Sequence, residues 1–372
     1  MWNLRNIKIL CKALGNPQKS FESIHIVGTN GKGSTALYLA NILQAHKINT
    51  GLFTSPHLVN VRERIRINGK MISQNELDSL SQRIEQAAKI ANIEPSYFEI
   101  LTAAAFLWFK EKEIQVAVLE AGMGGRLDCT KVAGGNIVAL TSIGLDHTEI
   151  LGNTKEKILK EKLGIAKKNA IIITKRKRIS PSLAVGNHGK IYIKNAELAW
   201  TVAKKLFSIT SRSFSIKQSR EALKKSVWHG RMQLLFKNVK LKAILDGAHN
   251  PAAAKILAEC LKEKKIGQLP CIFASFADKD TLGVLKHLKP HISVCYPAQI
   301  EGPRTRNAKE IAALCEKLKI KTMPLTGSIK NFIRKSKSPV LITGSLYLTG
   351  KAIAELCDEF SELAEFRGLE CN

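Results

Sequence analysis

The sequence lacks any apolar run that approaches the roughly 18 residues a membrane-spanning helix needs. Its longest candidate, at 101–109, is interrupted by Thr102 and is followed by Lys110. The N-terminal stretch carries Lys12 within its only apolar segment and has no small-residue cleavage site. We therefore expect neither a secretory signal nor a membrane span.

Paired cysteines are missing as well. The eight cysteines are scattered along the chain, and none belongs to a C-x-x-C pair. We therefore expect no structural zinc site and no disulfide framework, and a reducing cytoplasm fits this usage. Apolar residues make up 45% and charged residues 24% of the chain, which excludes a disordered or collagen-like protein.

Acidic residues are scarce beside basic ones: 31 Asp and Glu face 58 Lys and Arg, a net charge of +27 on 372 residues. The basic residues are densest between residues 151 and 190, with a continuous run at 175–178. A nucleic-acid-binding protein is one interpretation, but no aromatic interleaving, RNA-binding signature or zinc-finger spacing accompanies this run. We favour a solvated surface that serves anionic small substrates or non-specific contacts, and expect no specific nucleic-acid partner and no membrane.

Strand-like runs alternate with helical patterns along the chain. The expected strands lie at 24–27, 115–119, 137–143, 171–174, 241–245, 271–274, 292–296 and 340–343. The expected helices lie at 34–46, 74–92, 97–112, 154–168, 196–207, 252–264, 308–318 and 351–365. This alternation predicts an α/β protein with parallel sheets covered by helices. A boundary is expected near 236–240, because the strand at 241–245 and the turn after it restart the pattern. We therefore expect two domains, 1–238 and 239–372.

A glycine-rich segment, GTNGKGS at 28–34, stands between the first strand and the helix after it. Glycines allow backbone N–H groups to close on phosphate oxygens, and a helix N-terminus adds positive partial charge. Lys32 can reach the β- and γ-phosphates, and Ser34 can bind Mg²⁺. The strict Walker pattern has glycine where Ile26 stands, and Gly33 separates the lysine from the serine. The segment therefore predicts a variant phosphate loop.

Two further residues stand at the ends of expected strands. Glu120 ends the strand at 115–119, and His147 follows the strand at 137–143. A carboxylate at the carboxyl edge of a parallel sheet can hold Mg²⁺. Alone, such an acid is more often a solvated cap and such a histidine an ordinary surface or core residue. The phosphate loop nearby favours the functional interpretation of Glu120.

Lys162 is out of place on its helix. At helical spacing it shares a face with Ile158, Leu159, Leu163 and Ala166. A lysine there must extend its ammonium to water, pair with a charge, or lose its proton through desolvation. A neutral amine can add CO₂ and become a carbamate, a carboxylate-like metal ligand. The pattern alone leaves these interpretations open.

Ten segments follow one another in a recognisable order. They are GTNGKGS (28–34), TSPHLVNVRERIRING (54–69), FEILTAAAF (98–106), EAGMGGRLDCT (120–130), TSIGLDHTEILGNTKEKILKEKLGIAK (141–167), GRMQ (230–233), DGAHNP (246–251), DKD (278–280), EGPR (301–304) and TGSLYLTG (343–350). With them the chain resembles the folylpolyglutamate synthase/dihydrofolate synthase family within the Mur-type amide ligases, over most of residues 20–350. The segment at 54–69 resembles that family's folate-binding Ω-loop and speaks against a Mur-type ligase of cell-wall peptide.

The resemblance implies an N-terminal P-loop ATPase and folate-binding domain with a mostly parallel sheet, and a C-terminal Rossmann-like glutamate-ligase domain. It also implies roles for individual residues. The ATP contacts would be Asn30, Gly31, Lys32, Gly33, Ser34, Asn195, Arg231 and Asp246, the last brought over from the second domain. The Mg²⁺ ligands would be Ser34, Ser55, Glu120, His147 and Lys162, the last matching a lysine that is carbamylated in this family. The pterin substrate would contact Phe98, Glu99, Leu127 and Asp128.

The activity that the resemblance implies is ATP-dependent amide ligation with Mg²⁺. L-glutamate would be joined, through an acyl phosphate, to dihydropteroate or to reduced folates, with Lys32, His147 and Lys162 as catalytic residues. A monomer in the cytoplasm is expected. The sequence leaves open which of the two reactions dominates. The alternatives are a catalytically impaired homologue that still binds folate and ATP, and another Mur-type ligase.

Two departures from the family pattern bear on these expectations. The segment between residues 168 and 195 is shorter than in the family by several tens of residues, which bears on stability and on contacts to adenine. The proline that precedes Gly-Arg in the family is His229 here. Because proline restricts its own backbone and that of the residue before it, this exchange alters the turn beside Arg231.

Overall fold

The computed structural model describes residues 3–174, 190–302 and 305–369. The basic run at 175–178, most of the shortened segment, and the last two residues of the EGPR motif lie outside these ranges. The described residues form two compact units: 3–57, 61–174 and 192–226 make the first, and 58–60, 190–191, 227–302 and 305–369 the second. Within these ranges no helix is both long and apolar enough to cross a membrane.

The first unit is built on a seven-stranded sheet, ordered β4-β3-β2-β5-β1-β6-β7. Its strands are β1 (Glu22–Val27), β2 (Thr50–Phe53), β3 (Ile65–Ile67), β4 (Lys70–Met71), β5 (Val116–Glu120), β6 (Ile137–Leu140) and β7 (Ile171–Ile173). Five neighbouring strands, β2, β5, β1, β6 and β7, run parallel to one another. Strands β3 and β4 extend the sheet beyond β2, and each pairs antiparallel with its neighbour. A mostly parallel α/β sheet is what the sequence predicted.

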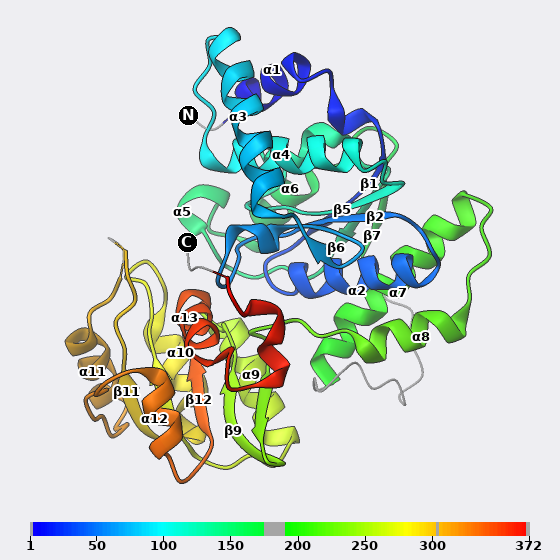
Figure 1. Ribbon diagram of the computed structural model, residues 1–372. Coiled ribbons are helices and arrows are strands. Elements are labelled where there is room, and N and C mark those ends of the chain that lie inside the picture. Colours follow the sequence, from blue (N-terminus) through cyan, green and yellow to red (C-terminus); the bar gives the residue numbers. More distant parts are fainter. Residues whose placement is uncertain (1–2, 175–189, 303–304, 370–372) are drawn as a thin grey trace. The chain divides into compact units, whose positions relative to one another are not determined.

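Helices cover both faces of this sheet (Figure 1). They are α1 (Arg5–Ala13), α2 (Lys32–Ala45), α3 (Gln74–Ile90), α4 (Tyr97–Glu111), α5 (Thr148–Leu151), α6 (Lys155–Leu163), α7 (Lys190–Ile209) and α8 (Ile216–Lys225), with short 3₁₀ turns η1 (Pro17–Lys19), η2 (Val61–Arg64) and η3 (Cys129–Ala133). Helices α1, α3 and α4 contact one another on one face, and α2 and α8 pack together on the other.

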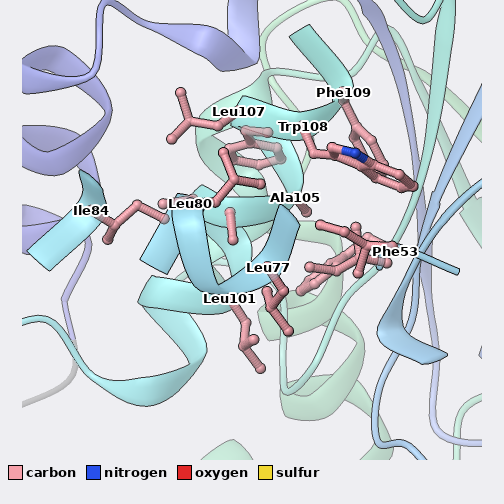
Figure 2. Packing of buried hydrophobic residues seen from close by; sticks show 14 of the residues in the cluster. Phe53, Leu77, Leu80, Ile84, Leu101, Ala105, Leu107, Trp108 and Phe109 are labelled. Carbon is pink, nitrogen blue, oxygen red and sulfur yellow. The ribbon is translucent and has the colours of Figure 1, made fainter. Parts of the chain in front are cut away.

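The main core of the first unit lies between the sheet and α4. Phe53, Ala117 and Leu119 point from β2 and β5 into a cluster with Phe106 and Phe109 of α4, and all five are fully buried. Figure 2 shows α3 closing the cluster from the other side of α4. Val118, on the opposite face of β5, is buried as well. Burial on both faces is the reason the parallel strands read as continuous apolar runs.

Serines begin the two helices of this layer. Ser73 and Ser96 each accept the backbone N–H of the glutamate three residues on, Glu76 and Glu99, whose side chains accept the serine backbone N–H in return. Such a capping box satisfies two backbone donors that a helix start otherwise leaves unpaired. The helices therefore begin at Gln74 and Tyr97, where the sequence predicted them.

The second unit is a five-stranded sheet, ordered β11-β10-β12-β9-β8, with only β8 antiparallel. Its elements are β8 (Gln233–Lys237), β9 (Lys240–Leu245), α9 (Pro251–Glu263), β10 (Leu269–Phe273), α10 (Thr281–Leu288), η4 (Lys289–His291), β11 (Ile292–Pro297), α11 (Ala308–Lys317), α12 (Ile329–Lys335), β12 (Val340–Thr343), α13 (Leu346–Leu356) and η5 (Ser361–Phe366). Because β8 pairs with β9, this compact unit starts at Val227, earlier than the boundary expected at 238/239. Val59 belongs to its apolar core as well.

Several elements differ from the expected ones. The strand expected to reach residue 143 stops at Leu140, because the next two residues turn to bond the phosphate loop. The helix expected at 154–168 ends at Leu163, and the one expected at 351–365 runs instead from Leu346 to Leu356. Strands β2, β3, β4 and β8 were not predicted. They are short or lie toward a sheet edge, where the apolar signal is weak.

Candidate active site

The carboxyl ends of four parallel strands meet at one edge of the first sheet. In register, Ile26 of β1 lies opposite Glu120 of β5 and Ala139 of β6, so the loops that follow these strands start side by side. Phe53 of β2 lies opposite Leu119, which brings the segment starting at Thr54 to the same edge. In parallel α/β sheets this edge is where ligands bind.

The loop at 28–34 is braced by the segment after β6. Asn30 is the main point of contact: its carbonyl accepts the hydroxyls of Thr141 at 2.8 Å and Ser142 at 2.9 Å, and its N–H donates to the Ser142 hydroxyl at 3.1 Å. Gly31 then adopts a left-handed φ of 85° and α2 begins at Lys32. The brace thus presents the N-terminus of a long helix at the sheet edge, which is an anion-binding arrangement.

Lys32 and Asn195 both contact this loop. The Lys32 ammonium donates to the Thr29 carbonyl at 3.4 Å and so stays folded over the loop. The Asn195 side chain comes from α7 and lies against Gly31, where an added Cβ would approach its Oδ1 to 2.6 Å. Glycine is favoured at position 31 because its φ of 85° lies in the left-handed region. The structure therefore brings Asn195 to the phosphate loop.

Glu120 and Ser55 are joined directly. The Oε2 atom of Glu120 accepts the backbone N–H of Ser55 at 3.1 Å, and the carboxylate is buried. Ser34, in the first turn of α2, is buried as well. Three oxygen-bearing side chains thus come from three segments at the same sheet edge: the start of α2, the end of β5 and the segment after β2. Hydroxyl and carboxylate oxygens are the donors that Mg²⁺ prefers.

Lys162 points from α6 into the same region. Its Nζ donates to the carbonyl of Gly28 at 2.8 Å, and the residue is only 5% exposed. Burial and the charge of Lys32 lower the pKa of Lys162 to about 8, against the opposing influence of Asp146 and Asp128. An ammonium extended to water, one of the interpretations open from sequence, is therefore excluded.

His147 takes a more exposed position than these residues. It precedes α5 with a left-handed φ of 51°, and its Nε2 lies 3.9 Å from the Asp146 carboxylate. The negative charge of Asp146 also raises the pKa of Lys162, so this carboxylate lies near enough to Lys162 to influence its protonation. The imidazole itself is about two-fifths exposed, at 43%.

The residues expected to contact the pterin divide into two pairs. Phe98 is half-buried, with its ring 5.8 Å from that of Phe53 and in contact distance of Gly122; Leu127 is half-buried too. The Glu99 carboxylate, by contrast, accepts the backbone N–H groups of Ser96 at 2.8 Å and Ile7 at 3.1 Å. Its observed contacts hold α4 and α1 together.

Asp128 has a similar bracing set of contacts. One carboxylate oxygen accepts the N–H groups of Gly122 and Met123, and the other accepts the N–H and the hydroxyl of Thr130. Burial raises the pKa of Asp128, and these hydrogen bonds oppose that rise. The Asp128 side chain thus holds the turn that follows Glu120 through its hydrogen bonds to Gly122 and Met123.

Arg231 and Asp246 lie next to each other in the second unit. Asp246, buried at the end of β9, accepts the N–H groups of Met232 at 2.7 Å and Ala248 at 2.9 Å. The Arg231 guanidinium donates to the carbonyl of Gly230 at 3.1 Å. The two turns that carry these residues are thereby locked together.

Comparison with known proteins assigns the family. The description "Mur ligase middle domain" matches residues 26–250, and "Mur ligase, glutamate ligase domain" matches residues 230–346. A dihydrofolate synthase/folylpolyglutamate synthase of Bacillus subtilis (strain 168) is 30% identical over an alignment of 402 residues that covers 92% of each chain. This chain belongs to that family.

Solved structures of the dihydrofolate synthase/folylpolyglutamate synthase family share its fold. Escherichia coli FolC in complex with DHPP and ADP superposes with a TM-score of 0.82 at 28% identity, over 96% of this chain and 94% of that one. A bifunctional folylpolyglutamate synthase/dihydrofolate synthase with Mn, AMPPNP and L-glutamate bound gives a TM-score of 0.83 at 28% identity, with the same coverage. Both the family resemblance and the fold class expected from the sequence are confirmed.

Some contacts at the candidate site of this family member were not predicted from the sequence. Thr141 and Ser142, which brace the loop, were expected to end a strand, although both belong to the quoted TSIGLDH motif. Among the described residues no group of three or more His, Cys, Asp and Glu could hold a metal. The candidate metal set is recognised only when serine hydroxyls and Lys162 are counted beside Glu120.

Proposed function

We propose that this chain is an ATP-dependent amide ligase that joins L-glutamate to dihydropteroate, to reduced folates, or to both. The observation that carries the proposal is the phosphate loop at 28–34 with Glu120 and Lys162 at the same sheet edge. Family membership supplies the substrates, since solved relatives are named as complexes with ADP, with DHPP, and with Mn, AMPPNP and L-glutamate.

Phosphoryl transfer is the first step of the proposed reaction. The N–H groups at the start of α2, from Gly31 to Ser34, bind the phosphates of ATP, and Lys32 stabilises the charge that develops on the γ-phosphoryl group. The carboxylate of the folate substrate attacks that group, giving an acyl phosphate and ADP. The amine of L-glutamate then attacks the acyl carbon and phosphate leaves.

Mg²⁺ belongs to the proposal, and the donors present fit it. Ser34, Ser55 and Glu120 would hold the ion, which would neutralise phosphate charge during transfer. His147 and a carbamate on Lys162 complete the proposed set. The low pKa of Lys162, about 8, supports the carbamate because only the neutral amine adds CO₂.

The remaining site residues keep their proposed roles. Asn195, Arg231 and Asp246 contact the nucleotide, and Asn30 and Gly33 contribute through the loop. The pterin lies against Phe98 and Leu127, and the loops that form its pocket are held by Glu99 and Asp128 through their hydrogen bonds to backbone N–H groups. We propose further that the chain acts as a monomer in the cytoplasm and that its basic surface serves anionic folates rather than a specific nucleic acid.

Phosphate release from ATP tests the activity. Purified protein receives Mg²⁺ and L-glutamate, with dihydropteroate and tetrahydrofolate in separate reactions, and mass spectrometry identifies the glutamylated products. Turnover with one substrate or both assigns the reaction. Lys162→Ala should remove turnover, and Lys160→Ala, an exposed lysine of the same helix, should leave it unchanged.

Absence of turnover with either substrate, in folded protein that still binds ATP, would contradict the ligase and support an impaired homologue. Salt-sensitive binding of RNA or DNA at physiological ionic strength, without folate-dependent ATP turnover, would instead support a nucleic-acid-binding protein.

A further inference from the structure

A chain of hydrogen bonds leads away from Arg231 to the C-terminal segment of the second unit. At its far end, Nε2 of His229 lies 3.0 Å from Oε1 of Glu365, which belongs to η5. On the other side of the ring, Nε2 of Gln233 lies 2.8 Å from Nδ1 of His229. An amide nitrogen only donates, so Nδ1 accepts and the ring proton is on Nε2, donating to Glu365.

The same glutamine continues the chain to the backbone. Oε1 of Gln233 accepts the N–H of Gly230 at 3.0 Å. The carbonyl of Gly230 in turn accepts the N–H of Gly247 at 2.9 Å and the Arg231 guanidinium at 3.1 Å. Every link from Glu365 to Arg231 is thus a hydrogen bond within one unit.

Packing holds the outer end of this chain in place. The His229 ring meets the ring of buried Phe366 edge to face, with centroids 4.9 Å apart at 87°. The segment η5 is also tied to β8, because Glu362 accepts the N–H of Phe236 at 2.9 Å. The His229 side chain is only 15% exposed, so its bonds compete little with water.

The turn at the inner end needs such support. Gly230 has a φ of 66° and Met232 a φ of 42°, so two of three successive residues lie in the left-handed region. A non-glycine residue in this region is strained, and it keeps that conformation only where the surrounding contacts hold it there. The family proline would restrict this turn through its ring; at this position the present chain has a side-chain network instead.

We propose that His229, held by Glu365 and Gln233, is a positioning residue that fixes the turn at 230–232 and thereby sets the Arg231 guanidinium for the nucleotide. The inference rests on the proposed function, in which Arg231 contacts ATP. In this proposal His229 acts through Arg231 and not by its own contact with substrate. Its loss therefore weakens nucleotide binding and leaves the chemistry of a bound substrate largely intact.

Steady-state kinetics of the full chain test this role. His229→Ala should raise KM for ATP about tenfold, with kcat and the KM values for folate and L-glutamate changed less than about twofold. Glu365→Ala should raise KM for ATP by a smaller factor. Glu365→Gln keeps an acceptor for the imidazole N–H and should stay near wild type.

Two further variants separate positioning from mere stabilisation. The double variant His229→Ala/Glu365→Ala should be no worse than His229→Ala alone, because residues of one network are not additive. Arg334→Ala removes the ion pair to Glu359, elsewhere in the same unit, and should leave KM for ATP unchanged. A lower melting temperature for His229→Ala with an unchanged KM for ATP would overturn the proposal, as would an equal rise in all three KM values.

Titration of the wild type and of His229→Ala with AMPPNP and Mg²⁺ distinguishes failure of the positioning role from failure of the proposed function. Wild type that binds the nucleotide while His229→Ala binds it equally well overturns only the positioning role. Wild type that neither binds nucleotide nor turns over ATP overturns both. A tenfold weaker affinity in His229→Ala supports the positioning role even where the folate substrate has not yet been assigned.

Discussion

Lys162 and Gly28 are joined by a hydrogen bond of 2.8 Å from the lysine Nζ to the glycine carbonyl. The bond ties α6 to the first residue of the phosphate loop. It is also compatible with a modified lysine, because a carbamate nitrogen keeps one N–H that can donate to Gly28. The amine is buried and its pKa lies near 8, so its neutral, reactive form is accessible near neutral pH.

Carbamate formation at Lys162 predicts a dependence on pH and on CO₂. A pKa lowered from 10.5 to about 8 means that the neutral amine becomes the main form as pH rises through about 8. At a fixed, limiting CO₂ concentration we expect turnover to rise between pH 7 and 9, because the neutral amine that adds CO₂ becomes more abundant, and we expect added bicarbonate to raise turnover across this range. Lys162→Ala should lose at least about 100-fold in kcat and recover part of it with added acetate.

Mass spectrometry provides the independent check on this prediction. Protein trapped under CO₂ should carry one carboxyl group on the peptide that contains Lys162. Turnover that ignores bicarbonate, together with an unmodified peptide, would contradict the carbamate while leaving the ligase activity untouched.

The contact between Glu120 and Ser55 predicts a metal-specific defect. Glu120→Gln retains an oxygen that can accept the Ser55 N–H, but it removes the negative charge that favours Mg²⁺. We expect the Mg²⁺ concentration for half-maximal turnover to rise at least about tenfold, with little change in melting temperature. Glu113→Gln, an exposed residue just before the same strand, is the matched control. Removal of the metal with EDTA should stop turnover without unfolding the protein.

Asp128 should affect stability more than substrate recognition. Its two oxygens accept four hydrogen bonds from Gly122, Met123 and Thr130. Asp128→Asn leaves one acceptor oxygen and places an amide donor against N–H groups, so we expect a loss of about 2 kcal/mol in the free energy of unfolding. Thermal unfolding of Asp128→Asn, together with its KM for folate measured well below the unfolding transition, distinguishes a structural role from a role in pterin binding. An unchanged melting temperature with a tenfold higher KM would assign Asp128 to the pterin instead.

The sequence predicted those parts of the candidate site that depend on local patterns. The phosphate loop followed from a strand, a glycine-rich turn and a helix in succession, and Glu120 from its place at the end of a strand. Lys162 was marked because a charged residue interrupts an apolar helix face. Each of these signals lies within one element, where periodicity and chemistry are read directly.

Contacts between distant segments were beyond such patterns. Nothing local indicates that Asn195 of α7 lies against Gly31, or that η5 folds back so that Glu365 meets His229. The capping box of Ser96 and Glu99 was readable from its spacing, and it explains why that glutamate faces backbone N–H groups.

Glu76 provides a stability prediction with a defined pH window. Its carboxylate accepts hydrogen bonds from the backbone N–H and the hydroxyl of Ser73 and from the indole N–H of Trp108 at 3.1 Å. It also forms an ion pair with Lys112 at 3.0 Å. These contacts, led by the hydrogen bond from Ser73, lower the pKa of Glu76 from 4.5 to about 2. A depressed carboxyl pKa contributes stability that is fully present above the unfolded value and is lost as pH falls through the folded one.

We therefore expect Glu76→Ala to lower the free energy of unfolding by about 1 kcal/mol at pH 7, a modest value because the side chain is partly exposed. The difference from wild type should shrink as pH falls from 4.5 toward 2, since wild type then loses the same charge. Thermal unfolding followed by circular dichroism across this range measures it. Glu85→Ala, an exposed residue of the same helix, should differ from wild type by less than about 0.5 kcal/mol at every pH. A Glu76→Ala difference that stays constant down to pH 2 would show that lost packing, and not the carboxylate charge, causes the effect.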